Sequence, residues 1–384
     1  MRVGVIGGGV YGSSIAHFLT RFGEDVVLFE EGSLGGVSTS KSAGIVRHHY
    51  SNRNHIEIMT RGRQILQNLE NHVGRDGGFC QNGYLGVVGA EHEETFREIV
   101  NIQQDIGLDV ELVEPSDMKH YLPDIDTTDI STGSYESEAG FADPYQVATA
   151  FAKKAGQQGA ELHSNTTVTD IAINDGVVSA IESDSERHDV DYVVNAAGPY
   201  GHEIGTMIGL DLPLTWYEVK IAILTASEPY GVDYPTLADM EKAFYTKPEH
   251  GGEFLFGGFN DPKMDDPDEK YKTVTNDDLI DITEFLEYRL PGYADAKLAN
   301  TWSGIITVSP DWHQIIGVPD GYENFYNIVA GSGHGFKEAA GFAESIAQEI
   351  AGKQPRFDLS PYRHERFETG DEIKGRYDSA GWLA

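Results

Sequence analysis

The sequence of 384 residues predicts an α/β + β fold, in which a parallel sheet with helices is joined to an antiparallel-sheet region. Three observations predict this class. The chain opens with a strand–turn–helix–strand pattern, its middle part carries long strands, and it closes with a strand that leads through a glycine-rich turn into a helix. The length is sufficient for two domains of ordinary size.

The opening segment has the pattern of a Rossmann-type βαβ unit, which binds dinucleotides. A short apolar strand (3–6) precedes the turn 7–12, whose sequence is Gly-Gly-Gly-Val-Tyr-Gly, and a helix follows that stops at Gly23. A second strand (25–29) leads into Glu30, whose carboxylate can accept hydrogen bonds from a ribose diol.

The three glycines of the G-x-G-x-x-G pattern have separate physical roles. Gly7 allows the turn, Gly9 lets the backbone approach a pyrophosphate, and Gly12 lets helix and strand pack closely. These residues leave NAD and FAD open as alternatives, and a glycine-rich turn of another α/β protein is a third interpretation.

The later segments are predicted from apolar periodicity and turn residues. The expected helices are 61–72, 93–106, a helix that Pro144 begins, 279–290 and a last helix that ends at Gly352. The expected strands are 84–88, 110–113, a hairpin of 166–173 and 177–182 around Asn174-Asp175-Gly176, 190–195, 219–225, 254–259 and 325–329, with an acidic loop over 261–278 and a turn over 331–335.

The charge of the chain is strongly negative. Lys and Arg number 28 against 62 Asp and Glu, which gives a formal net charge of −34. Such a charge repels phosphate backbones and anionic membranes, so we expect neither a nucleic acid nor a membrane as partner. Because the acids are spread along the chain, we interpret them as an acidic, halophilic surface adapted to high salt.

Cysteine usage and hydropathy indicate the compartment. The single cysteine, Cys80, excludes an intrachain disulfide and any cysteine-built metal site, and its simplest interpretation is a small buried hydrophobic residue. No apolar run has the length of a membrane span, and the first residues are predicted to form a strand instead of a signal sequence. We therefore expect a cytoplasmic protein.

Four further stretches carry a resemblance to a known family over nearly the whole chain. They are Ser42-Ala43-Gly44-Ile45-Val46-Arg47, the segment Gly140 to Pro144, Val193-Val194-Asn195-Ala196-Ala197-Gly198, and Ser309-Pro310-Asp311 with Gly333-His334-Gly335-Phe336-Lys337. With these stretches the chain resembles the D-amino-acid-oxidase type of FAD-dependent oxidoreductase, most closely the branch of sarcosine oxidase, glycine oxidase and dimethylglycine dehydrogenase.

The resemblance implies a discontinuous FAD-binding domain. We expect residues 1–80, 140–213 and 301–360 to form it, 81–139 and 214–300 to form the substrate domain, and 361–384 to be a C-terminal tail. The residues expected to contact FAD are Gly7, Gly9, Val10, Tyr11, Gly12, Glu30, Ser42, Ala43, Val168, Ala197, Gly198, Gly304, Gly333, His334, Gly335 and Phe336.

Two of these contacts have a specific expected form. In the family, the position of Val168 offers backbone atoms to the adenine. The amides of the helix that follows 333–335, and its dipole, would favour negative charge on a reduced flavin ring.

The resemblance also implies a substrate site. Arg47 and Lys337 stand at positions that hold the substrate carboxylate in sarcosine oxidase, as an arginine fork and a lysine point charge suit an anion. Each could instead form an ion pair with one of the many acids. Tyr245 and Tyr217 fall on strands that line the substrate pocket in the family, although packing explains them equally well.

The departures from the family make further predictions. Lys41 stands where dimethylglycine dehydrogenase has the histidine linked to FAD, and Gly304 where monomeric sarcosine oxidase has the linking cysteine, so FAD is expected to bind non-covalently. The strand 254–259 lacks the lysine that promotes reaction of reduced flavin with oxygen in that oxidase. A dehydrogenase is therefore favoured over an oxidase.

The expected reaction is oxidation of the carbon–nitrogen bond of a small anionic amine substrate, an amino acid or N-methyl amino acid, by hydride transfer to flavin. A 2-hydroxy acid dehydrogenase, an NAD enzyme and the flavin subunit of a larger complex remain as alternatives. The electron acceptor and the oligomeric state stay open. We expect no metal, because His48, His49 and His334 have no carboxylate or cysteine at a matching spacing.

Overall fold

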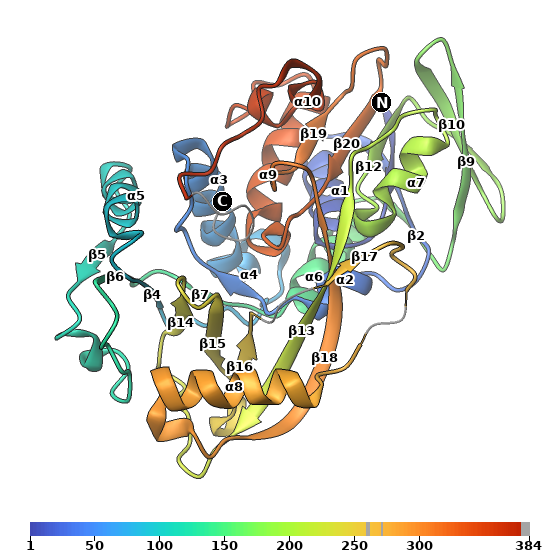
Figure 1. Cartoon of the computed structure of the whole chain (residues 1–384). Coiled ribbons are helices and arrows are strands. Elements are labelled where there is room, and N and C mark those ends of the chain that lie inside the picture. Colours follow the sequence, from blue (N-terminus) through green and yellow to red (C-terminus); the bar gives the residue numbers. More distant parts are fainter. Residues whose placement is uncertain (259–261, 270–271, 378–384) are drawn as a thin grey trace.

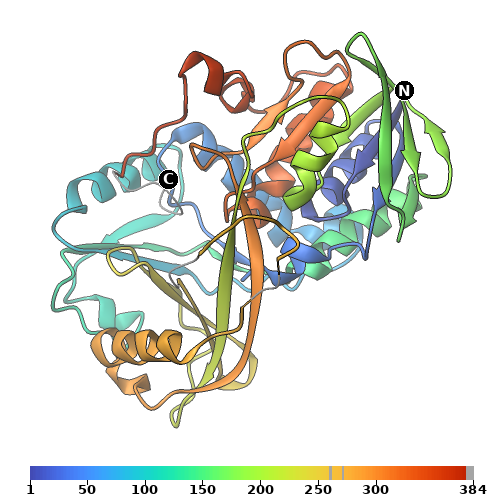
Figure 2. The same cartoon turned by 45° about the vertical axis from the view of Figure 1, so that its right-hand side comes forward.

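The computed structural model describes residues 1–258, 262–269 and 272–377. Two large sheets dominate it (Figure 1). The sheet that contains the N-terminal strand lies with its helices at one side of the molecule, and a second sheet with long strands lies at the other, as the turned view in Figure 2 shows.

The first sheet has six strands, and five of them are parallel. Its edge strand β19 pairs antiparallel with β20. In sheet order the strands are β19 (Ile315–Gly317), β20 (Phe325–Val329), β12 (Tyr192–Asn195), β1 (Arg2–Ile6), β2 (Asp25–Glu30) and β8 (Glu161–Ser164). The central strands are mostly apolar because both faces of the sheet are covered, and the two buried asparagines, Asn195 and Asn327, hydrogen-bond to each other.

Helices cover one face of this sheet and a small sheet covers the other. The helices α1 (Val10–Arg21), α6 (Pro144–Gln157) and α9 (Gly335–Ile350) share an apolar core with β1, β2 and β20. The other face packs on α7 (Gly201–Thr206) and on the three-stranded sheet of β9 (Val168–Asn174), β10 (Val177–Ser183) and β11 (Arg187–Asp189).

The local signals in this part confirm the sequence predictions. Asp175 and Gly176 both have positive φ, 48° and 80°, and they form the two-residue turn between the antiparallel strands β9 and β10. The Asp143 side chain accepts a hydrogen bond from Gln146 N at 2.9 Å and so caps α6, which Pro144 begins.

The second sheet has nine strands. Its strands pair antiparallel except for β4 and β14, which are parallel. This pair departs from the predicted antiparallel sheet, and the parallel arrangement is possible only because β4 and β14 are joined by a long connection and not by a hairpin. The strands are β17 (Lys263–Met264), β13 (Thr215–Thr225), β16 (Phe254–Gly257), β15 (Phe244–Pro248), β14 (Thr236–Asp239), β4 (Tyr84–Val88), β6 (Thr132–Glu136) and β5 (Val110–Val113), with β18 (Lys297–Val308) on the free side of β13.

Two helices flank the second sheet. The helix α8 (Asn276–Arg289) shares an apolar core with β4, β13 and β16, and α5 (Glu93–Asp105) packs near β4 and β5. The remaining elements connect the two sheets or follow them. They are α2 (Val37–Lys41), α3 (Arg53–Gln67), α4 (Leu69–Val73), α10 (Arg366–Thr369) and the paired strands β3 (Ile45–Val46) and β7 (Gly140–Phe141).

Three predicted boundaries were wrong for identifiable reasons. The helix expected at 61–72 begins at Arg53, because Asn52 caps it through His55 N, and it breaks at Asn68 into α3 and α4. The helix expected at 279–290 begins at Asn276, since Thr275 and Asp278 form a capping box. The acidic loop therefore ends earlier and includes the short strand β17.

Some predictions extend beyond the described residues. Residue 259 of the strand expected at 254–259, residues 261 and 270–271 of the acidic loop, and residues 378–384 of the tail lie outside the described part. In the part of the chain that the structure describes, no helix combines the length and apolar character required to span a membrane.

Candidate functional site

A cavity of about 1260 Å³ lies between the two sheets. It is larger than the roughly 300–1,000 Å³ of most small-molecule pockets, as expected if it holds a dinucleotide together with a second molecule. The structure brings almost all predicted site residues to its wall: Gly7, Gly9, Val10, Tyr11, Glu30, Ser42, Ala43, Arg47, Val168, Ala197, Gly198, Tyr217, Tyr245, Gly304, Gly333, His334, Gly335, Phe336 and Lys337.

Gly12 is buried behind this wall and does not line the cavity. A Cβ at Gly12 would lie 1.9 Å from the Gly7 carbonyl oxygen, so this glycine serves the close packing of α1 on the turn. Gly7 has a φ of 104°, and a Cβ there would lie 2.4 Å from the Ala196 carbonyl oxygen. Both positions therefore require glycine, because any side chain would clash with the backbone of the turn or of its neighbour.

The N-terminus of α1 opens onto the cavity. Its N-cap residue Gly9 has no capping side chain, and Val10 N donates to Thr39 Oγ1 at 3.1 Å. Free amides at the start of a twelve-residue helix favour a phosphate group at this place.

The Glu30 carboxylate is fixed by two backbone amides. Gly8 N donates to Oε2 at 2.7 Å, and Gly32 N donates to Oε1 at 2.8 Å. Each carboxylate oxygen has a further lone pair, so Glu30 can still accept hydrogen bonds from a ligand in the cavity.

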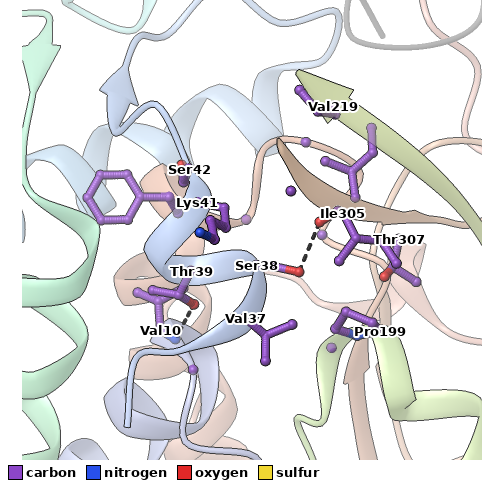
Figure 3. Close-up of a pocket in the computed structure, with 18 of the residues that line it drawn as sticks. Val10, Val37, Ser38, Thr39, Lys41, Ser42, Pro199, Val219, Ile305 and Thr307 are labelled. Atoms are coloured by element: carbon purple, nitrogen blue, oxygen red, sulfur yellow. Dashed lines mark hydrogen bonds between the residues drawn. The ribbon is translucent and has the colours of Figure 1, made fainter. Parts of the chain in front are cut away.

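The helix α2 is held against the long strand β18 (Figure 3). Ser38 Oγ donates to the Ile305 carbonyl at 2.9 Å, and Trp302 Nε1 donates to the Lys41 carbonyl at 3.0 Å. A Cβ at Gly304 would lie 2.7 Å from Lys41 Cβ. The Lys41 side chain therefore occupies the space in which a side chain at position 304 would begin.

The N-terminus of α9 reaches the opposite part of the wall. Its N-cap residue His334 is buried, makes no side-chain capping bond, and both of its ring nitrogens lack a hydrogen-bond partner among the described residues. Burial and the neighbouring charges of Lys337 and Arg47 hold the pKa of His334 well below its usual value. His334 is therefore neutral at physiological pH.

Arg47 and Lys337 lie on the same wall and are almost fully buried. Arg47 is 7% exposed and Lys337 6%. The Arg47 guanidinium carbon lies 4.4 Å from the ring centre of Tyr50, and Lys337 Nζ lies 5.9 Å from that same ring. Burial and the Arg47 charge lower the pKa of Lys337 to about 7, and Glu338 opposes this shift in part. No described carboxylate forms an ion pair with the Lys337 ammonium.

Glu338 is engaged elsewhere in a buried network. It accepts hydrogen bonds from Tyr11 Oη at 2.6 Å and from His55 Nε2 at 2.8 Å, and Gln314 Nε2 also donates to it. This carboxylate therefore links α9 to α3 and to the first turn of α1, and it makes no ion pair with Lys337 among the described contacts.

Several residues of the site were not predicted. The hydroxyls of Tyr50 and Tyr84 are buried without a hydrogen-bond partner among the described residues, and Tyr50 stacks below the two cations. Thr236 of β14 has a similarly unpartnered hydroxyl, and it lines the cavity with Tyr84 and Tyr245. The meeting of Tyr84 and Thr236 depends on the pairing of β4 with β14, for which the sequence carries no local signal, whereas Tyr50 lies in the loop that follows Arg47.

The histidines next to Arg47 have structural partners. His48 Nδ1 lies 3.0 Å from Glu136 Oε2, and His49 Nε2 lies 2.7 Å from Tyr377 Oη. Among residues 1–258, 262–269 and 272–377, no group of three or more His, Cys, Asp or Glu could hold a metal ion.

The parallel sheet, the glycine turn and the cavity beside them define a dinucleotide-binding protein. The family model described as "FAD dependent oxidoreductase" (DAO) matches residues 2–349, so the chain belongs to this family, whose cofactor is FAD.

Known relatives agree with this membership. The chain is 28% identical to human dimethylglycine dehydrogenase, a mitochondrial protein, over 95% of this chain and 44% of that protein. It is 25% identical to sarcosine oxidase subunit beta of an Arthrobacter species, over 96% of this chain and 91% of that one. The chain thus spans less than half the length of dimethylglycine dehydrogenase.

Solved structures share the fold. L-proline dehydrogenase from P. horikoshii superposes with a TM-score of 0.89 at 26% identity, covering 97% of this chain and 99% of that chain. Glycine oxidase from Bacillus cereus superposes with a TM-score of 0.76 at 23% identity, covering 92% and 95%.

Proposed function

We propose that this chain uses FAD to oxidise the carbon–nitrogen bond of a small amino acid or N-methyl amino acid to an imine. The observation that carries the proposal is the pair of buried cations, Arg47 and Lys337, on the wall of a cavity built for a dinucleotide. Relatives named for the oxidation of dimethylglycine, sarcosine and L-proline support the same class of substrate.

Two like charges buried side by side favour an anionic ligand. The lowered pKa of Lys337 shows the cost of its burial beside Arg47. A carboxylate between the two would offset that cost: the Arg47 fork binds it in a planar, bidentate manner, and Lys337 adds a point charge. The Tyr50 ring contacts both cations, 4.4 Å from the Arg47 guanidinium carbon and 5.9 Å from Lys337 Nζ.

The residues present fit FAD. The α1 N-terminus would hold the pyrophosphate, Glu30 the ribose, and the backbone around Val168 the adenine. The amides at the start of α9 would stabilise negative charge on the isoalloxazine ring. When bound, FAD supplies the oxidant that accepts a hydride from the substrate carbon. The chain itself holds the carboxylate and keeps His334 neutral, and water hydrolyses the released imine.

FAD is bound without a covalent link. Position 304 carries no side chain, and the Lys41 side chain fills the space beside it. Neither residue can form the histidine or cysteine link that the family uses, so the affinity for FAD comes from the non-covalent contacts of the cavity.

The cofactor domain comprises residues 1–80, 140–213 and 301–360, and the substrate domain comprises 81–139 and 214–300. In support, the six-stranded sheet takes all its strands from the first three segments. The long strand β18 crosses the boundary at 300 and connects the two parts.

The electron acceptor is a molecule other than oxygen. The strand β16 carries no cation, and the lysines of its neighbours are paired: Lys247 with Glu249 at 2.6 Å and Lys220 with Asp278 at 2.8 Å. With no free ammonium on these strands, and with Lys337 engaged by the substrate carboxylate, we expect reduced flavin to react slowly with oxygen. We place the protein in the cytoplasm, where it acts on a small anionic amine.

An anaerobic bleaching screen tests the proposed function. Holoprotein is mixed with glycine, sarcosine, dimethylglycine, L-proline and D-amino acids, and the absorbance of oxidised FAD is followed. Bleaching by at least one of these amines is expected. Bleaching by 2-hydroxy acids and by no amine would overturn the proposal in favour of a hydroxy acid dehydrogenase.

A further inference from the structure

The last described residues of the chain pack against the loop that carries Arg47, one of the two cations proposed to bind the substrate. After α10, residues 373–377, here called the C-terminal strap, run to the start of α3 and to α5, where Arg376 bonds to Ser51 and Glu98. This course places the strap against the loop 47–51, which carries Arg47.

Specific bonds hold the strap at both ends. Arg366 binds Asp311 with two hydrogen bonds, of 2.7 and 2.9 Å, and Ile373 N donates to the same carboxylate at 2.9 Å. Further on, Arg376 N donates to Ser51 Oγ and Arg376 Nε to the Ser51 carbonyl, each at 2.9 Å. The strap is thus a defined structural element.

Tyr377 contacts the loop through His49. The Tyr377 side chain is buried, 5% exposed, and its Oη lies 2.7 Å from His49 Nε2. Burial lowers the pKa of His49 to about 3, so this imidazole is neutral, and a hydrogen bond between its Nε2 and the Tyr377 hydroxyl forms in either tautomer.

His49 in turn contacts Arg47. The His49 carbonyl accepts a hydrogen bond from Arg47 Nη1. On the other side of the loop, Glu136 accepts from His48 N at 2.7 Å and from Gln103 Nε2 at 2.9 Å. The loop is therefore held from one side by Glu136 and from the other by Tyr377, and the position of the Arg47 fork depends on both.

We infer that Tyr377 is a positioning residue for the substrate carboxylate: through His49 it fixes the loop that orients Arg47. The inference rests on the proposed function, in which Arg47 binds that carboxylate. It assigns the C-terminal strap a role in affinity for substrate, with no role in the redox step.

The test is a ligand titration of the full-length holoprotein. Propionate, a carboxylate that has no amine to oxidise, is added to the wild type and to Tyr377→Phe, and its Kd is taken from the change in visible FAD absorbance. Tyr322→Phe is the matched control, because it removes a tyrosine hydrogen bond, 3.0 Å to the Ile208 carbonyl, far from Arg47 in the sequence and outside the cavity wall.

The expected result is a Kd about 2- to 10-fold higher in Tyr377→Phe, the range for one lost hydrogen bond, with no change in Tyr322→Phe. The rate of FAD reduction at saturating substrate should stay within about twofold of the wild type, because positioning affects binding more than chemistry. In an Arg47→Met background, Tyr377→Phe should have no further effect on Kd.

Equal Kd values for Tyr377→Phe and Tyr322→Phe would overturn the inference, and so would an undiminished effect in the Arg47→Met background. Arg376→Met, which removes the side-chain bonds of the strap to Ser51 and Glu98, is a second variant and should raise the Kd in the same direction. If Arg47→Met itself leaves the Kd unchanged, Arg47 does not bind the carboxylate and the proposed function is wrong. This outcome differs from the outcomes that overturn only the role of Tyr377.

Discussion

Lys337 should make carboxylate binding depend on pH within the physiological range. Its pKa is lowered to about 7 by burial and by Arg47, so the free protein has a charged ammonium below this pH and a neutral amine above it. The bound carboxylate favours the charged form. The Kd of propionate should therefore be lowest below pH 7 and should rise as the pH increases, by up to about tenfold per unit.

Two variants divide this effect between the cations. Lys337→Met should weaken binding and remove the pH dependence between 6 and 9. Arg47→Met should also weaken binding but move the midpoint to higher pH, because the Arg47 charge is one cause of the lowered pKa. Each substitution should weaken the binding free energy of propionate by about 1.5–3 kcal/mol, the amount typical of a charge-assisted hydrogen bond.

The assay is a titration of holoprotein with propionate at a series of pH values, monitored by FAD absorbance, with propionamide as the uncharged control. Propionate stays ionised over this range, so its own titration does not contribute. A Kd that is constant from pH 6 to 9, or a dependence that survives in Lys337→Met, would refute the assignment of Lys337 to the substrate carboxylate.

Three further predictions concern the cofactor and the whole molecule. Acid denaturation should release FAD into the supernatant, and colour that stays with the pellet would show a covalent link. Gly7→Ala should bind FAD poorly and be less stable by more than about 1 kcal/mol, because the new Cβ would clash with the Ala196 carbonyl. Gly23→Ala is the control: Gly23 also has a positive φ, of 95°, but a Cβ there has no atom within 4 Å, so this variant measures the cost of the backbone angle alone. Because the net charge is −34, molar KCl should raise the unfolding temperature, and an unchanged or lower temperature would exclude a screening role.

Local signals were sufficient for much of the fold. The glycine turn, the Asp175-Gly176 hairpin and the start of α6 at Pro144 each depend on the conformational preferences of a few adjacent residues. The boundaries of α3 and α8 were missed because polar residues at their N-termini, Asn52 and Thr275, cap the helices before the apolar periodicity begins.

The composition of the site could be predicted where family motifs mark the residues, but its supporting contacts could not. Arg47 and Lys337 are 290 positions apart, and only the pairing of α3 with α9 and the course of the loop bring them together. The contact of Tyr84 with Arg47 and that of Tyr377 with His49 each join segments that are distant in the sequence. The spacing of residues along the chain does not predict such long-range contacts.

The central claim is that two buried cations select an amine by its carboxylate. The most direct measurement compares the rate of anaerobic FAD reduction by the amino acid that bleaches the holoprotein best with the rate for its analogue that lacks the carboxylate, such as L-proline with pyrrolidine. We expect the amino acid to be preferred by at least about 100-fold in the wild type, and the double variant Arg47→Met with Lys337→Met to lose most of this preference. Equal rates for the two compounds in the wild type would contradict it.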